Sequence, residues 1–116
     1  MKIPPKIQNQ LSQFEQVRQQ LQLLTTQRIQ VESQLRELEN AIQELDKTGK
    51  NTIIYKKVGS LFVKVDNKKD LHSNLTEQKE TFDVRMKTLE RQEKQLKERY
   101  TELQRDISNA VQSLEQ

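Results

Sequence analysis

The chain of 116 residues is long enough for one domain, but only 32% of its residues are hydrophobic, against about 45 to 50% in a typical soluble domain. Another 32% are charged, and Gly and Pro number two each, so the composition favours long helices or disorder over a globular core. The net charge is +3, but it is unevenly distributed. The segment from Asp46 to Asp70 holds seven lysines and three aspartates and so has a charge of +4, whereas all other residues together have a charge of −1.

The first predicted element is a helix over residues 5–48. Pro4 and Pro5 suit its first turn, where a missing N–H does no harm, and Gly49 is the expected stop. Apolar residues at steps of four and three predict a helix that needs a facing helix. The stripe runs through Ile7, Leu11, Phe14, Val17, Leu21, Leu24, Arg28, Val31, Leu35, Leu38, Ile42 and Leu45, with Arg28 as its only polar member. Steps of three on both sides of Phe14 predict a local phase shift, a stammer.

The second predicted element is a β-hairpin over residues 53–65, which is rich in Val, Ile, Tyr and Phe. Gly59 and Ser60 form a two-residue loop with Gly first, which is typical of a type II′ turn. Val58 should then face Leu61, and Ile54 should face Val65.

The third predicted element is a helix over residues 67–115, capped by Asp66 or Asn67. Apolar residues recur at seven-residue intervals, namely at Leu75, Phe82, Leu89, Leu96 and Leu103. The alternate seam positions are expected at Gln78, Arg85 and Gln92, so this seam is predicted to be rich in polar residues. If the hairpin sets the register, facing residues have numbers that sum to about 114. This places Ile7 opposite Ile107, Leu11 opposite Leu103 and Phe14 opposite Tyr100.

The predicted fold is therefore mainly α: a long antiparallel two-helix coiled coil connected by a single β-hairpin, in one unit spanning residues 1–116. A lone hairpin is marginal in water and exposes an apolar face and two open edges. We therefore expect it to join an intersubunit β-barrel. The expected interface residues are Ile54, Tyr55, Val58, Gly59, Leu61, Phe62, Val63 and Val65.

These elements carry a family resemblance. Two segments carry this resemblance: the hairpin Ile54-Tyr55-Lys56-Lys57-Val58-Gly59-Ser60-Leu61-Phe62-Val63-Lys64 and, in the second helix, Leu89-Glu90-Arg91-Gln92-Glu93-Lys94-Gln95-Leu96. With these segments, the order helix, hairpin, helix resembles the β-class subunit of prefoldin, the archaeal form in particular. The resemblance implies an ATP-independent chaperone that holds non-native polypeptides at the coiled-coil tips and delivers them to a group II chaperonin. It also implies a hexamer of two α-class and four β-class subunits.

The expected client-binding residues are apolar side chains near the tip: Ile3, Ile7, Leu11, Ile107, Val111 and Leu114. The alternative is that Ile7, Leu11, Ile107 and Leu114 simply close the coiled coil. Ile3 precedes the helix and Val111 lies off the stripe, so these two are the better candidates for exposed contacts. One tip should bind weakly, whereas several tips on one platform can raise binding by about 10² to 10⁴ through avidity.

No catalytic constellation is present, because the sequence has no Gly-rich phosphate loop and its carboxylates are scattered over helix surfaces. We expect no enzyme activity, no cofactor and no metal site, because there is no Cys and His72 is the only histidine. His72 is expected to have a structural role or to be solvated. The aliphatic part of the Arg28 side chain is expected to pack along the seam while its guanidinium extends to water, or Arg28 pairs with Glu32 or Glu90.

No stretch has the length and apolar character of a signal peptide or membrane span, so a cytoplasmic protein without membrane partners is expected. Two alternatives stay open. The basic hairpin could bind nucleic acid, although it lacks interleaved Arg, and we expect no nucleic-acid partner. The chain could also be a purely structural oligomerisation spacer.

Overall fold

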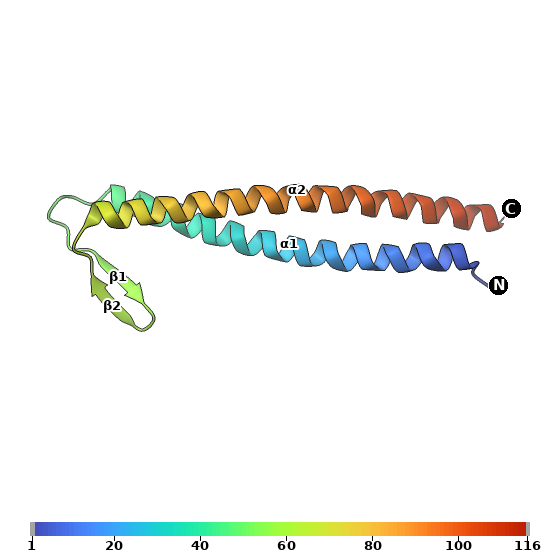
Figure 1. Cartoon of the computed structure of the whole chain (residues 1–116), viewed down its shortest axis with the longest axis horizontal. Helices are drawn as coiled ribbons and strands as arrows, with labels where there is room; N and C mark the ends of the chain where they lie inside the picture. Colours follow the sequence, from blue (N-terminus) through green and yellow to red (C-terminus); the bar gives the residue numbers. More distant parts are fainter. Residues whose placement is uncertain (1, 116) are drawn as a thin grey trace. The chain divides into compact units, whose positions relative to one another are not determined.

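The computed structural model describes residues 2–115, and Met1 and Gln116 lie outside this range. Its elements are helix α1 (Pro5–Asp46), strand β1 (Tyr55–Val58), strand β2 (Leu61–Lys64) and helix α2 (Lys68–Glu115), as Figure 1 shows. The predicted class, two long helices joined by a two-stranded antiparallel hairpin, is confirmed.

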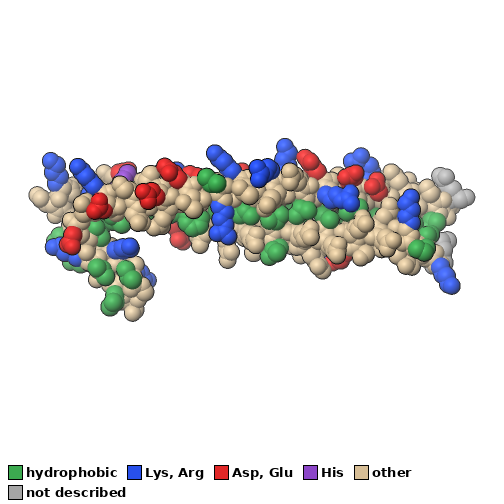
Figure 2. All heavy atoms as spheres, in the orientation of Figure 1, with side chains coloured by type: hydrophobic (Ala, Val, Ile, Leu, Met, Phe, Trp, Pro, Cys, Tyr) green, Lys and Arg blue, Asp and Glu red, His purple; other side chains and the backbone are tan. Residues whose placement is uncertain are grey.

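The chain forms two compact units, each built from parts of both helices. The terminal unit consists of Met1–Gln30 and Lys87–Gln116, and the hairpin unit consists of Val31–Met86. Within each unit α1 and α2 lie side by side and run in opposite directions (Figure 1). Apolar side chains gather along the line where the helices meet, and charged side chains project from the outer faces (Figure 2). The core of each unit is therefore a thin seam, as the low apolar content requires.

The seam of α1 keeps one unbroken alternation of three and four residues. Its members are all buried or half-buried: Ile7, Gln10, Phe14, Val17, Leu21, Leu24, Arg28, Val31, Leu35, Leu38, Ile42 and Leu45. Gln10 occupies the position that was expected for Leu11, and the Leu11 side chain is 41% exposed. The predicted stammer is thus wrong, because the helix keeps its heptad phase by accepting an amide in the seam.

The seam of α2 also differs from the prediction. Gln78, Arg85 and Gln92 are exposed, and the residues that follow each of them are buried or half-buried instead. The observed seam is Leu75, Lys79, Phe82, Met86, Leu89, Glu93, Leu96, Tyr100, Leu103, Ile107 and Ala110. It is more apolar than expected, because Met86 and Tyr100 contribute side chains that the predicted phase had placed outside.

The antiparallel register is fixed by contacts within each unit. In the terminal unit the rings of Phe14 and Tyr100 lie 4.6 Å apart between centroids, which confirms the predicted pairing of these two residues. In the hairpin unit Lys68 Nζ donates a hydrogen bond of 2.8 Å to the carbonyl oxygen of Thr48. Lys68 is the first residue of α2, and Thr48 lies just after the end of α1. This bond therefore connects the two helix ends at the base of the hairpin.

The end of α1 is set by Thr48 rather than by Gly49. The Thr48 hydroxyl donates a hydrogen bond of 2.6 Å to the carbonyl oxygen of Leu45, and the Thr48 backbone N–H donates to the same oxygen at 3.2 Å. Gly49 does not adopt a positive φ, so the expected left-handed glycine stop is wrong. The helix therefore ends at Asp46, two residues before the predicted bound of 48.

The hairpin has the predicted register. Val58 pairs with Leu61 and Tyr55 pairs with Lys64. The N–H of Val65 donates to the carbonyl oxygen of Ile54 at 2.8 Å, so the pairing continues one residue beyond the regular strands. Gly59 has φ of 61°, and Ser60 has a negative φ. This combination fits the predicted type II′ turn, since a type I′ turn needs positive φ at both loop residues.

Replacing Gly59 with Ala should weaken the hairpin by about 1 to 2 kcal/mol, because an L-residue is strained at this φ. Apart from Gly59 and its two chain neighbours, no heavy atom of residues 2–115 lies within 4 Å of the position that the new Cβ would take, so the cost comes from the backbone and not from crowding. Hydrogen exchange of the Val65 amide in the assembled protein should speed up by about tenfold. Ser60→Ala is the matched control, and equal exchange rates in the two variants would contradict the assignment.

Candidate functional site

The hairpin presents apolar side chains that the rest of residues 2–115 leaves exposed. Tyr55, Val58, Leu61, Phe62 and Val63 are all exposed, with Leu61 and Phe62 at 66% and 70%. Cross-strand partners share a face, so Val58, Leu61 and Val63 lie on one side with Lys56, and Tyr55 and Phe62 lie on the other side with Lys57 and Lys64. Two short strands with this much open apolar surface are suited to pairing with other chains.

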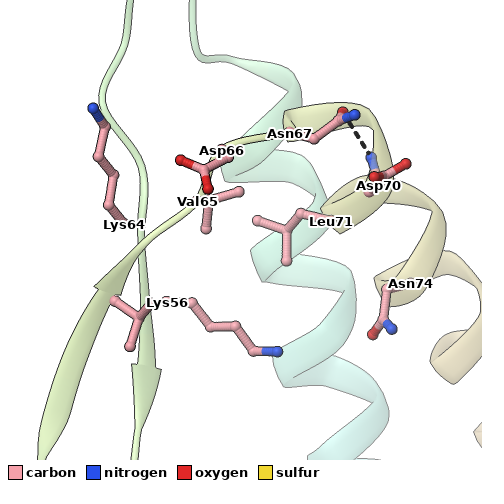
Figure 3. A pocket seen from close by; sticks show the side chains of 9 residues that line it. Lys56, Lys64, Val65, Asp66, Asn67, Asp70, Leu71 and Asn74 are labelled. Carbon is pink, nitrogen blue, oxygen red and sulfur yellow. Dashed lines mark hydrogen bonds between the residues drawn. The ribbon is translucent and has the colours of Figure 1, made fainter.

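The base of the hairpin is anchored to the helices. Ile54 and Val65, which complete the aliphatic face, are half-buried rather than exposed. Val65 and Leu71 point toward one another in the hollow between the hairpin and α2 (Figure 3). Ile54 lines a second hollow with Leu45 and Leu75. The aliphatic face is thus held against its own helices at one end and left open at the turn.

The start of α2, directly after the hairpin, is capped by a side chain. Asn67 Oδ1 accepts hydrogen bonds from the backbone N–H groups of Lys69 and Asp70, at 3.0 and 3.2 Å. The bond to Asp70 is drawn in Figure 3. Of the two candidate caps, Asn67 is therefore the one that acts, and α2 begins at Lys68.

The six residues that were expected at the tip all lie in the terminal unit, but their surroundings differ. Ile3, Leu11, Val111 and Leu114 are exposed, Ile107 is half-buried, and Ile7 is only 5% exposed. Ile7 therefore closes the seam, as the structural alternative requires. The exposed set is apolar surface close to both ends of the chain, and it includes Leu11, which the predicted seam had buried.

A buried carboxylate lies in the seam of the terminal unit, and sequence reasoning missed it. Glu93 Oε2 accepts a hydrogen bond of 2.7 Å from Arg28 Nε, and Glu93 Oε1 lies 3.1 Å from Lys97 Nζ. The Glu93 side chain is only 8% exposed. The bond from Arg28 holds the pKa of Glu93 below its ordinary value; burial opposes this shift and Lys97 adds to it.

Arg28 thus bonds across the seam to Glu93, an acid that was not among the expected partners Glu32 and Glu90. Its guanidinium does not simply extend to water, since it bonds to a buried acid on the facing helix. The missed signal was the heptad itself. Glu93 follows Leu89 by four residues and precedes Leu96 by three, and this places it in the seam once charged residues are allowed there.

His72 makes a local contact at the base of the hairpin. Its Nε2 lies 3.1 Å from Asp46 Oδ1, so it links α2 to the last residue of α1. Within residues 2–115, no group of three or more His, Cys, Asp and Glu side chains is placed to hold a metal ion. Among the described helices, none is both long and apolar enough to cross a membrane.

Antiparallel helices in each unit, an open apolar hairpin in one unit and exposed apolar side chains in the other are the features of an oligomerising coiled-coil subunit. A family model described as "Prefoldin subunit" matches residues 8–114. The chain belongs to the prefoldin family, and it is a chaperone subunit.

The relatives agree with this assignment. The chain is 47% identical to the prefoldin subunit beta of Archaeoglobus fulgidus over 109 residues, which cover 94% of this chain and 93% of that one. It is 45% identical to the prefoldin subunit beta of Thermococcus onnurineus over the same shares of both chains. The crystal structure of the prefoldin beta subunit from Thermococcus strain KS-1 is similar, with a TM-score of 0.83, 40% identity and coverage of 94% and 95% of the two chains. The resemblance to β-class prefoldin that the sequence predicted is confirmed.

Proposed function

We propose that this subunit assembles through its hairpin with further β-class copies and with an α-class prefoldin subunit into an α2β4 hexamer. In this proposal the hairpins form a shared β-barrel, and the helical pairs carry non-native polypeptides at their terminal ends. The client is then delivered to a group II chaperonin in the cytoplasm, without nucleotide or any other cofactor. The observation that carries this proposal is the set of exposed apolar side chains on both faces of the hairpin, above all Leu61 and Phe62 at 66% and 70%.

The proposed client contacts are the exposed apolar side chains of the terminal unit: Ile3, Leu11, Val111 and Leu114. Ile107 can contribute from the edge of the seam, whereas Ile7 contributes by holding the helices together. A contact of one such side chain is worth about 1.5 to 3 kcal/mol at most, while association costs on the order of 4 to 15 kcal/mol. One tip is therefore weak, and several tips on one hexamer bind through avidity.

The function is tested by diluting a chemically denatured client into the hexamer co-expressed with an α-class subunit, and by following light scattering without ATP. The mass of the assembly is measured on the same samples. Suppressed scattering from a hexamer supports the proposal, and a properly assembled hexamer that leaves the scattering unchanged contradicts it. Scattering that changes steeply with salt would point to binding by the basic hairpin instead of by apolar tips.

The double substitution Ile3→Ser and Val111→Ser should raise the hexamer concentration needed for half-maximal suppression by about tenfold or more, because each tip loses two apolar contacts. The helices should keep their stability, since both side chains are exposed. Leu23→Ser with Ile29→Ser is the matched control, because these α1 side chains are also exposed, at 61% and 55%. A control that loses as much activity as the tip variant would contradict the assignment of the site.

A further inference from the structure

The position between Ile7 and Phe14 holds two adjacent residues of opposite character. Gln10 lies in the seam, and the neighbouring Leu11 lies outside it. On either side the seam is well packed: Ile7 is buried, and Phe14 stacks on Tyr100 of the facing helix. An amide thus occupies an apolar seam while a leucine one residue away faces water.

The buried amide is poorly accommodated. Gln10 Oε1 is shielded from solvent, and it accepts no hydrogen bond from any group in residues 2–115. A shielded acceptor without a partner destabilises the packing that shields it, and an exposed leucine loses the gain from its own burial. Both effects favour the opposite arrangement, with Leu11 inside and Gln10 in water.

That opposite arrangement is close to the observed one. Ile7 and Phe14 are one heptad apart, so both stay in the seam whether the residue between them is Gln10 or Leu11. Adjacent residues lie about 100° apart around an α-helix, and the two candidates therefore flank the seam on opposite sides. A roll of the first turns of α1 about the helix axis exchanges them, and the helix takes up this roll as a local overwinding, a stammer.

We propose that the first turns of α1 exchange between two packings, one with Leu11 in the seam and one with Gln10 in the seam, and that a non-native polypeptide binds to the second and stabilises it. This inference rests on the proposed function and adds its regulation. In the first packing the terminal unit hides one apolar side chain when no client is present. In the second packing the terminal unit exposes the Leu11 side chain. This second packing is the one that the structure describes. A client shifts the equilibrium only through its preference for the packing with Leu11 outside.

Single and double substitutions separate exchange from a fixed packing. In the Gln10→Leu variant, one leucine stays outside the seam whichever of residues 10 and 11 enters it. Client binding should therefore tighten by about 2- to 10-fold, which is the inverse of the fraction of wild-type molecules that have Leu11 outside. In the combined variant Q10L/L11Q, the leucine is always inside and the glutamine outside. Its client binding should therefore be weaker than that of the wild type, and its melting temperature should be higher.

A chemical readout follows the exchange without any client. This chain has no cysteine, so Leu11→Cys introduces one thiol into each of its copies in the hexamer. Its alkylation should be at least about threefold slower than that of Ile29→Cys, and Q10L should accelerate it by holding the cysteine outside. Equal alkylation rates at the two sites, with no effect of Q10L, would overturn the exchange and leave Leu11 permanently outside.

The two experiments distinguish the possible failures. If alkylation reports exchange but Q10L binds client no better than the wild type, the proposed selection by client is overturned. If no form of the hexamer suppresses aggregation, the proposed function and the role of the client fail together. The alkylation rates then still decide whether the helix exchanges its packing. Supporting results are slow alkylation at position 11 and its acceleration by Q10L. Client affinity should also be highest for Q10L, lower for the wild type and lowest for Q10L/L11Q.

Discussion

Replacing Leu61 with Asp should dissociate the assembly while it leaves the isolated chain folded. The Leu61 side chain is 66% exposed on the aliphatic face of the hairpin and makes little contact within its own chain. A loss of assembly in this variant therefore has to come from contacts with other subunits. The expected product is a smaller species that keeps its helical circular dichroism signal.

The magnitude follows from what Asp would do in a shared sheet. Losing the burial of one leucine removes about 1.5 to 3 kcal/mol, and burying an unpaired carboxylate costs several kcal/mol more. Since each 1.4 kcal/mol is about tenfold in affinity, association at each affected interface should weaken by at least about 1,000-fold. Mass measured by light scattering across a dilution series, with the α-class subunit present, reads this directly.

Leu23→Asp is the matched control for the hairpin variant. It introduces the same charge at a leucine of similar exposure, but on α1, beside the seam with α2 and outside the hairpin. The hexamer should keep its mass in this control. A Leu61→Asp hexamer that stays intact at dilutions where the control is intact would show that the aliphatic face is not the assembly surface.

Replacing Arg28 with Leu should lower the free energy of unfolding by about 3 kcal/mol, the low end of the range for breaking a buried ion pair. Glu93 would keep its charge at neutral pH and stay buried, with its 2.7 Å bond to Arg28 lost. Lys97 limits the damage, because its ammonium group lies 3.1 Å from the same carboxylate. Thermal unfolding at one fixed protein concentration is the appropriate measurement, since assembly also contributes to stability.

The double variant in which both Arg28 and Glu93 become Leu should behave in the opposite way. It removes both charges and restores an apolar seam, and such replacements are neutral or stabilising by about 1 to 4 kcal/mol. Arg36→Leu is the control, because Arg36 pairs with Glu32 on the surface at 3.3 Å and its loss should change stability by about 0.5 kcal/mol or less. A double variant less stable than the single variant would contradict the account of a buried ion pair.

The same pair predicts the direction of the pH dependence. The pKa of Glu93 is lowered in the folded chain from its ordinary value of 4.5, first by the bond from Arg28. The folded carboxyl therefore binds a proton less readily than the unfolded one, and its contribution is fully present above pH 4.5 and is lost as the pH falls through the lower, folded pKa. Below pH 4.5 the wild type should consequently lose stability relative to the double leucine variant.

Several features follow from local sequence alone. The order helix, hairpin, helix is predicted from the change of apolar period, and the type II′ turn at Gly59 from the loop length and the glycine. Asn67 is one of two caps that the sequence offered, and its amide oxygen has the required N–H groups within reach. These features depend on a few neighbouring residues, so they could be predicted without knowledge of the rest of the chain.

The phase of each seam could not be predicted in this way. On α1 the apolar pattern permits either Gln10 or Leu11 between Ile7 and Phe14, and only packing against α2 decides which one is inside. On α2 the polar character of Glu93 hid a seam position, because a buried carboxylate is acceptable only when a cation reaches it. The cation that reaches it across the seam, Arg28, comes from the other helix, and no pattern within α2 shows which of its acids Arg28 will meet.

The sequence by itself therefore determined the class of fold, the position of the hairpin turn and the cap of the second helix. The tertiary structure decided which flank of each helical stripe faces the partner helix, and so it placed Leu11 outside and Glu93 inside. The physical reason is that turns and caps are satisfied by bonds between near neighbours. The rotation of a helix about its own axis is instead fixed by side chains that arrive from a facing helix, such as the Tyr100 ring that stacks 4.6 Å from that of Phe14.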